Sequence, residues 1–198
     1  MRINQQERLE IESWIVGFTD GEGCFSISIF RNNTAKSGWQ VFPEFVITQG
    51  EKSLSALELF EEYFECGKVF VNKRYDNHSE HLYRYCVRSV NDLRAKVIPF
   101  FREHRLRTAK QKDFEIFAKI VEMIARKRHL TKSGLRAIAR EIERMNRKKK
   151  SQFLESSETT RRAPRKREPG GLGRLWNRIN SESNTKKLPL CAVMHKWS

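Results

Sequence analysis

The chain has 198 residues and a formal net charge of +15, a length that allows one ordinary domain with an appendage. Residues 1–125 contain 18 Lys and Arg against 18 Asp and Glu, whereas residues 126–198 contain 21 against 6; such a cationic arm usually binds nucleic acid, with an anionic membrane surface as the weaker rival. The sequence has no transmembrane-length apolar run, no signal-peptide pattern and no CxxC pair, which excludes a membrane span, argues against a zinc site and predicts an intracellular protein.

The first predicted helix covers residues 7–20, where apolar side chains recur at helical spacing, and leads into GFTDGEG at residues 17–23. Asp20 and Glu22 therefore face the negative end of the helix dipole, where Lys or Arg would be favoured. A sequence that breaks a local rule in this way often serves a site, and paired oxygen donors on a glycine-rich turn suit Mg²⁺. The alternative is a glycine helix cap with two solvated acids.

Four strands are predicted in two pairs. In the first strand the apolar side chains of Phe25, Ile27 and Ile29 alternate with polar positions, so they occupy one face. Pro43 in the second strand suggests a bulge or an edge position. The predicted strands span residues 24–30, 39–48, 68–75 and 82–89.

Helix signals separate and follow the strand pairs. Ser53 is predicted to cap a helix that contains Phe64, and Asn91 or Asp92 to cap one that stops before Pro99. A long helix is expected from a cap at Thr108 through about residue 126.

The basic arm begins near residue 127. Residues 133–147 are predicted to form a helix with one apolar stripe, and the segment after it has the composition of a disordered chain. The expected organisation is a core at 1–126, a basic helical extension at 127–150 and a basic, flexible arm at 151–198.

The order of elements predicts an α+β fold of the αββαββα type, in which helices cover one face of an antiparallel sheet. The other face would carry hydroxyl and guanidinium groups, among them Ser26, Ser28, Arg84 and Arg88. Such a face can read base edges in the major groove of DNA. An ordinary solvated sheet face would carry similar residues, so both interpretations stay open at this level.

Residues 15–23, IVGFTDGEG, resemble the motif that names the LAGLIDADG homing endonucleases, and αββαββα is also that family's order of elements. Thr48-Gln49 after the second strand and Lys110-Gln111-Lys112 in a late helix add to the resemblance, which covers roughly residues 9–146. It implies a site-specific DNA endonuclease that makes double-strand breaks with Mg²⁺, for which Mn²⁺ can substitute.

The resemblance also implies an assembly, since the chain has one such motif. Family members with one motif act as homodimers, which here would place Gly17, Val16 and Asp20 at the interface between two motif helices. A two-fold dimer predicts a pseudo-palindromic target in double-stranded DNA.

Carried over residue by residue, the resemblance implies that Glu22 is the metal ligand, with the backbone carbonyl of Gly21 beside it. Gln49 would orient solvent near the scissile phosphate, and Lys110 would stabilise transition-state charge. The family often has an Arg four residues after this Gln, where the chain has Ser53, although a Lys is adjacent.

DNA contacts are carried over to the polar faces of the strands and to the start of the arm, which would act mainly on phosphates. The expected contact residues are Ser26, Ser28, Asn32, Lys68, Asn72, Arg74, Arg84, Arg88, Lys127 and Arg128.

Two other functions use the same fold. An intron RNA maturase would bind RNA, and a DNA-binding regulator would have lost catalysis. Glu22, Gln49 and Lys110 together argue against a lost site but do not exclude intron RNA as a second partner.

Overall fold

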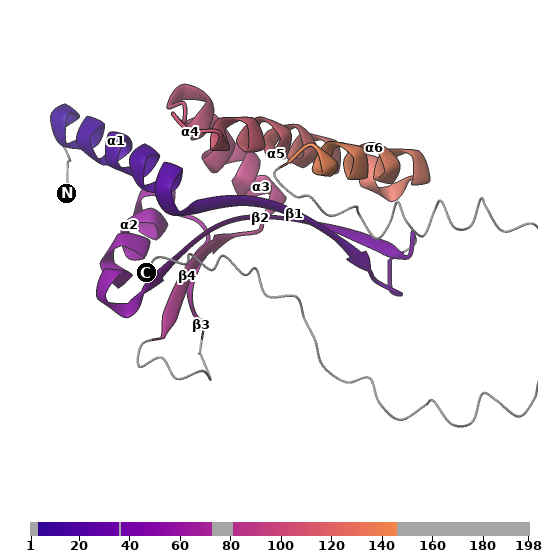
Figure 1. Ribbon diagram of the computed structural model, residues 1–198, viewed down its shortest axis with the longest axis horizontal. Helices are drawn as coiled ribbons and strands as arrows, with labels where there is room; N and C mark the ends of the chain where they lie inside the picture. Colours follow the sequence, from indigo (N-terminus) through magenta and orange to yellow (C-terminus); the bar gives the residue numbers. More distant parts are fainter. Residues whose placement is uncertain (1–3, 36, 73–80, 146–198) are drawn as a thin grey trace, which may run out of the picture. The chain divides into compact units, whose positions relative to one another are not determined.

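The computed structural model describes residues 4–35, 37–72 and 81–145. Four strands and a set of helical segments form this part of the chain (Figure 1). In chain order they are α1 (Gln5–Glu22), β1 (Gly23–Arg31), β2 (Trp39–Gly50), the 3₁₀ turn η1 (Glu51–Ser53), α2 (Leu54–Phe64), β3 (Lys68–Asn72), β4 (Leu82–Val87), α3 (Val90–Asp92), the π-helical η2 (Leu93–Val97), α4 (Ile98–Glu103), α5 (Lys110–Ala125), the 3₁₀ turn η3 (Arg128–Leu130) and α6 (Lys132–Glu143).

The four strands form one antiparallel sheet in the order β1-β2-β4-β3. Side chains alternate between its two faces, and the register places Gly23 opposite Ile47 and Phe45 opposite Val87. The predicted α+β fold with an antiparallel sheet is therefore confirmed. The predicted strands were close in extent, although β2 continues to Gly50 and the last residues predicted for the third strand lie outside the described part.

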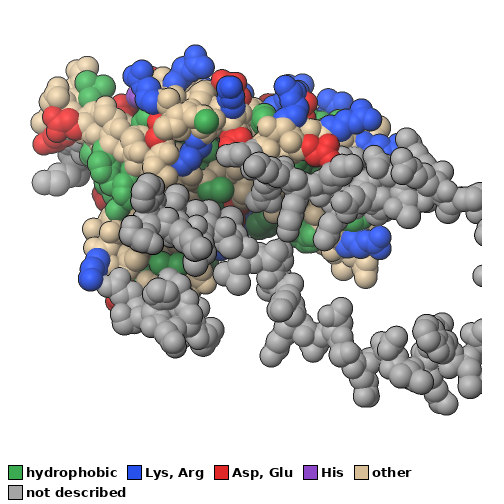
Figure 2. Space-filling view, viewed as in Figure 1, with side chains coloured by type: hydrophobic (Ala, Val, Ile, Leu, Met, Phe, Trp, Pro, Cys, Tyr) green, Lys and Arg blue, Asp and Glu red, His purple; other side chains and the backbone are tan. Residues whose placement is uncertain are grey.

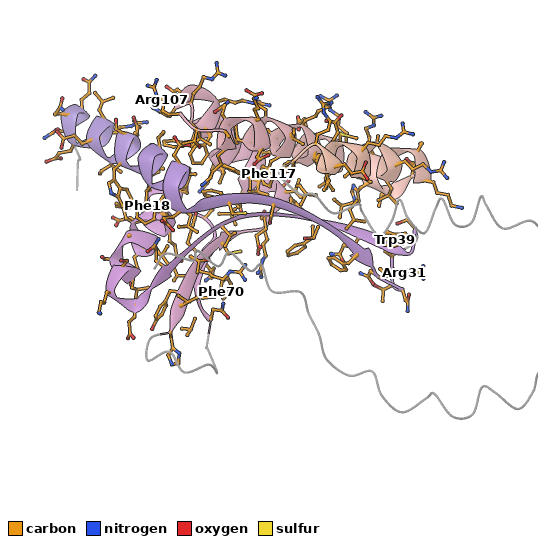
Figure 3. All side chains as sticks on the ribbon, viewed as in Figure 1. Phe18, Arg31, Trp39, Phe70, Arg107 and Phe117 are labelled. Carbon is orange, nitrogen blue, oxygen red and sulfur yellow. The ribbon has the colours of Figure 1, made fainter. Side chains whose placement is uncertain are left out.

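Helices cover one face of the sheet, and aromatic side chains fill the space between them (Figure 1). Phe25 and Phe45 from the strands contact Phe101 of α4, and Phe25 also contacts Phe117 of α5, with ring centroids 5.3–5.6 Å apart. Figure 3 shows Phe117 between α5 and the sheet. Such rings bury large apolar areas, so this layer fixes the helices on one side. No described helix covers the other face of the sheet, which is called the open face below.

Helix α1 begins with a capping box, in which Asn4 accepts a hydrogen bond from the Glu7 amide and the Glu7 side chain accepts one from Asn4. Further along the helix, the buried Glu12 carboxylate accepts hydrogen bonds from Arg8 Nε at 2.7 Å and from Tyr63 Oη at 2.8 Å. Because Tyr63 belongs to α2, this network fixes α1 against the neighbouring helix.

Two predicted helix boundaries between residues 89 and 103 were wrong. Ser89, and not Asn91 or Asp92, caps α3, and the helix does not stop before Pro99. A π-helical turn precedes α4, in which the Ile98 amide donates to the Leu93 carbonyl. Pro99 follows in the first turn of α4, where proline is tolerated because its missing N–H is not needed for an intrahelical bond.

Other predicted caps differ in detail. Ser53 is the N-cap residue of α2 but makes no capping hydrogen bond, and Ala109 rather than Thr108 is the N-cap residue of α5. The helix predicted at 133–147 is α6, capped by Thr131; its stripe of Leu135, Ile138 and Ile142 is buried as expected. The segment predicted as a flexible arm, 151–198, lies outside the described residues.

None of the helices in the described part of the chain is long and apolar enough to span a membrane. Figure 2 shows Lys and Arg side chains gathered over α4, α5 and α6.

Candidate active site and nucleic-acid interface

Glycine at position 23 lets the chain turn directly from α1 into β1. The Gly23 amide bonds the Thr19 carbonyl, and a Cβ on Gly23 would lie 2.6 Å from Thr19 Cγ2 and 2.9 Å from the Thr19 carbonyl oxygen. Only glycine fits there without displacing the last turn of the helix. The consequence is that Gly21 and Glu22 lie at the end of the sheet, with the Glu22 side chain exposed.

Lys110, the first residue of α5, reaches the same helix end. Its Nζ donates to the Thr19 carbonyl at 2.8 Å and, more weakly, to the Gly21 carbonyl at 3.4 Å. Burial lowers the pKa of the Lys110 ammonium, while the negative charges of Asp20 and Glu22 oppose that shift. Two of the predicted site residues, Gly21 and Lys110, are thus in contact although they are far apart in the sequence.

Asp20 bonds the loop that precedes α5. Its carboxylate accepts hydrogen bonds from the Arg107 amide at 2.6 Å, from the Thr108 amide at 3.3 Å and from Thr108 Oγ1 at 2.7 Å (Arg107 is labelled in Figure 3). Burial by itself raises the pKa of Asp20, but these hydrogen bonds outweigh it and lower the pKa below its ordinary value. Asp20 therefore holds Lys110 near α1 by fixing the loop before it.

Gln49 lies near the end of β2, opposite Tyr83 of β4. It follows Ile47, the partner of Gly23, by two positions, so it lies at the same end of the sheet as the α1 terminus and on the same face as Ile47. Ser53, where the family often has a basic residue, ends η1, and the adjacent Lys52 is exposed.

Few side chains at this end of the sheet could bind a metal ion. Across the described ranges, no three His, Cys, Asp or Glu side chains lie close enough together to hold a metal ion. The Glu22 carboxylate and the Gly21 carbonyl are nonetheless hard oxygen donors of the kind that Mg²⁺ prefers, and Glu22 has no hydrogen-bond or ion-pair partner among the described residues. These two oxygen donors therefore fit part of a magnesium coordination shell.

One face of α1 is open and partly apolar. Leu9 and Trp14 are 50% and 38% exposed, and ideal Cβ atoms on Gly17 and Gly21 would meet nothing within 4 Å. Val16 is partly buried against the core. The helix thus presents a smooth surface that a second helix could approach closely.

The open face of the sheet carries most of the predicted DNA contacts. The register puts Ser26 and Ser28 of β1, Lys68 and Asn72 of β3, and Arg84 of β4 on this face.

Three other predicted DNA-contact residues lie outside the strands. Asn32 Nδ2 donates to Gln40 at 2.7 Å, and its Oδ1 accepts from Thr34, so Asn32 organises the β1–β2 turn. Lys127 and Arg128 are exposed in the helical extension, whereas Arg74 lies outside the described residues.

The comparisons with known proteins agree with this arrangement. The family model described as LAGLIDADG endonuclease matches residues 15–121, which run from the middle of α1 into α5. The chain belongs to the LAGLIDADG endonuclease family. The matched residues include IVGFTDGEG at 15–23.

One similar protein is the probable intron-encoded endonuclease 2 of Neurospora crassa, 33% identical over 126 residues, which are 64% of this chain and 27% of that protein. The probable intron-encoded DNA endonuclease 1 of Mycosarcoma maydis is 37% identical over 103 residues, 52% of this chain and 34% of that protein. The chain thus spans about a quarter to a third of the length of these relatives.

Solved structures of LAGLIDADG proteins share the fold. The homing endonuclease I-TnaI is 36% identical with a TM-score of 0.65, covering 80% of this chain and 99% of that one. I-SmaMI bound to cleaved DNA is 29% identical with a TM-score of 0.63, covering 74% of this chain and 47% of that one.

Sequence reasoning missed Glu44, which lies in the middle of β2 on the open face. Its carboxylate accepts hydrogen bonds from Arg84 Nη2 at 3.0 Å and from Arg88 Nε at 2.7 Å. The alternation along β2 places Glu44 on the polar face, but only the pairing of β2 with β4 brings it to the two arginines. No signal within the sequence gives that register.

A basic cleft of about 670 Å³ also lies between the helices, away from the candidate active site. It includes none of Glu22, Gln49 and Lys110. Its lining is Arg102, Arg105, Gln111, Phe114, Glu115, Ala118, Lys119, Glu122, Met123, Arg126 and Arg128.

Proposed function

We propose that this LAGLIDADG protein is a site-specific, Mg²⁺-dependent DNA endonuclease that acts inside the cell as a homodimer. The observation that carries the proposal is the end of α1, where the Glu22 carboxylate, the Gly21 carbonyl and the Lys110 ammonium meet beside the open face of the sheet. Family membership and the likeness to I-SmaMI bound to cleaved DNA support the same reaction.

Glu22 and the Gly21 carbonyl would hold the magnesium ion. When bound, the ion would supply an activated water and neutralise charge on the phosphate. The matching Glu22 and Gly21 of a second chain would complete the ligand set, which is why one chain offers only half of it. The likeness to I-SmaMI bound to uncleaved DNA in the presence of calcium ions, with 30% identity and a TM-score of 0.66 over 80% of this chain and 49% of that one, supports a divalent-ion site.

Lys110 would place a positive charge next to the scissile phosphate. The bond to the Thr19 carbonyl at 2.8 Å fixes its ammonium close to Glu22, so little reorganisation is needed when the phosphate gains charge. The lowered pKa of Lys110 also makes it a better proton donor to the leaving oxygen. Gln49, at the same end of the sheet, would orient the attacking water.

The dimer would form through the open face of α1. Gly17 and Gly21 stand four residues apart on this face, and helices with small residues at that spacing approach closely. Two-fold symmetry would then put two Glu22 side chains near the axis and the two open sheet faces along one duplex, whose target would be pseudo-palindromic.

Replacing Glu22 with Gln tests the site assignment. The probe is a pool of DNA duplexes that join the sequences on either side of the gene, incubated with the full-length chain in Mg²⁺, in Mn²⁺ and in chelator. We expect discrete double-strand cuts by the unaltered chain in either metal ion and none in chelator, and we expect Glu22→Gln to bind without cutting.

The matched control is Glu58→Gln, which removes an exposed carboxylate from α2 and should cut normally. Cleavage by Glu22→Gln at the normal rate would refute the assignment of Glu22. Tight binding without cuts by the unaltered chain would favour a regulator, or a maturase whose partner is intron RNA.

A further inference from the structure

Glu44 is an acid at the centre of a surface that we propose to meet DNA. Its side chain is 14% exposed, and it lies opposite Ser26 of β1. A carboxylate here repels phosphates, and its burial is costly unless it is paired. The groups that donate hydrogen bonds to Glu44 therefore have to account for a charged acid at this position.

Among the described residues, the three hydrogen bonds to the Glu44 carboxylate all end on the same oxygen, Oε1. Arg84 Nη2 donates at 3.0 Å, Arg88 Nε at 2.7 Å and Cys86 Sγ at 2.8 Å. Burial raises the pKa of the Cys86 thiol to about 12, so the thiol is protonated and donates at neutral pH. Burial alone would raise the pKa of Glu44, but the bonds from Cys86 and Arg88 and the charge of Arg84 lower it, so the carboxylate stays ionised.

Arg88 keeps its reading edge available. Glu44 accepts only from Nε, so Nη1 and Nη2, the pair at the end of the guanidinium, are not bonded to Glu44, although Cys86 also interacts with this guanidinium. The group also lies over the rings of Phe42 and Phe70, at 5.5 and 5.7 Å, and Figure 3 shows Phe70 on the strand side away from the helices. Held at one nitrogen and between two rings, this 45%-exposed side chain has few alternative positions.

Arg84 is held differently. Its Nη2 donates to Glu44 at 3.0 Å and contacts Cys86 Sγ at 3.9 Å. Both edges of a guanidinium that can bind guanine with two bonds include Nη2, together with either Nε or Nη1. One N–H of Nη2 points at Glu44, while the second N–H of Nη2 lies on the other edge, so Arg84 also keeps one edge with two donors.

We propose that Glu44 is a positioning residue for Arg88: it holds Nε, so that the Nη1–Nη2 edge binds a guanine with two bonds. This inference rests on the proposed DNA-binding function and deepens it. It also accounts for an acid on this face, because the shared carboxylate offsets one positive charge and reduces attraction to phosphates, which carry no sequence information.

The test is selection of bound duplexes from a randomised DNA library by the full-length chain, with Ca²⁺ in place of Mg²⁺. The unaltered chain should enrich a motif with a guanine in each half-site. Arg88→Lys keeps the positive charge but removes the paired N–H donors that bind guanine with two bonds. It should lower the preference for that guanine at least about five-fold. Arg84→Lys keeps a cation beside Glu44 and should leave the preference for that guanine unchanged.

Glu44→Gln removes the charge at nearly constant shape and should lower the preference for the same guanine by a similar factor. Combined with Arg88→Lys it should cause no further loss, since both changes act on one contact. The matched control is Glu51→Gln, an exposed acid of η1, which should leave the motif intact.

An unchanged guanine preference in folded Glu44→Gln would overturn the positioning role. Loss of the same guanine preference in Arg84→Lys would overturn the assignment of that guanine to Arg88, and that comparison holds even if the Glu44 variant does not fold. If the unaltered chain enriches no motif, the proposed function fails together with this inference. A motif that is insensitive to Glu44 overturns this inference alone.

Discussion

Replacing Gly17 with Ala should change the stability of the single chain and the affinity of the proposed dimer in opposite directions. Within the chain, the added Cβ meets nothing within 4 Å, and Gly17 lies well inside α1. Gly in a helix interior costs about 1 kcal/mol relative to Ala, so the free energy of unfolding of the isolated chain should rise by about that amount. A single chain therefore gains stability from the substitution.

In the proposed dimer the same methyl group enters the contact between two α1 helices. An extra methyl group in a packed contact costs about 1–3 kcal/mol, and symmetry introduces two of them. The dissociation constant of the dimer should therefore rise at least about 30-fold, and cleavage at low protein concentration should fall in parallel.

Two measurements check this prediction. Sedimentation over a range of protein concentrations gives the dissociation constant, and urea unfolding at concentrations where monomers dominate gives the stability of the chain. The control is Ser55→Ala on the exposed side of α2, which should raise helix stability by a few tenths of a kcal/mol and leave self-association unchanged. Gly17→Ala with unaltered self-association would refute the placement of Gly17 in the interface.

Two further substitutions test the end of α1. Gly23→Ala should lower the free energy of unfolding by about 1–3 kcal/mol and reduce cleavage, because its Cβ would lie 2.6 Å from Thr19 Cγ2; urea unfolding and cleavage rates measure both, and wild-type values in both would contradict the close contact. Asp20→Asn should cost about 1–3 kcal/mol at neutral pH, since the amide cannot accept all the bonds from Arg107 and Thr108. The folded-state pKa of Asp20 is lowered, so the stability it contributes is present above its unfolded-state pKa of about 3.8 and is lost as the pH falls through the folded-state value. The difference between the two chains should shrink on acidification, and a difference that stays constant down to pH 2 would count against the carboxylate bonds.

The sequence alone determined the features that depend on neighbours along the chain. Alternation in β1 predicted which side chains face the core, because successive strand residues point to opposite faces. The run from Gly17 to Gly23 predicted that α1 ends within it and pointed to Glu22 as a candidate site residue. Both follow from effects within one turn, the conformation of glycine and the charge of the helix dipole. Even the local rules failed at Pro99, where a π-helical turn let the helix continue.

Only the tertiary structure decided which distant residues meet. Lys110 reaches the Thr19 carbonyl because Asp20 fixes the loop before α5, and Glu44 reaches Arg84 because β2 pairs with β4 in one register. These contacts join residues 40–91 positions apart. Their partners are set by how the helices and strands pack, so local propensity and periodicity carry no information about them.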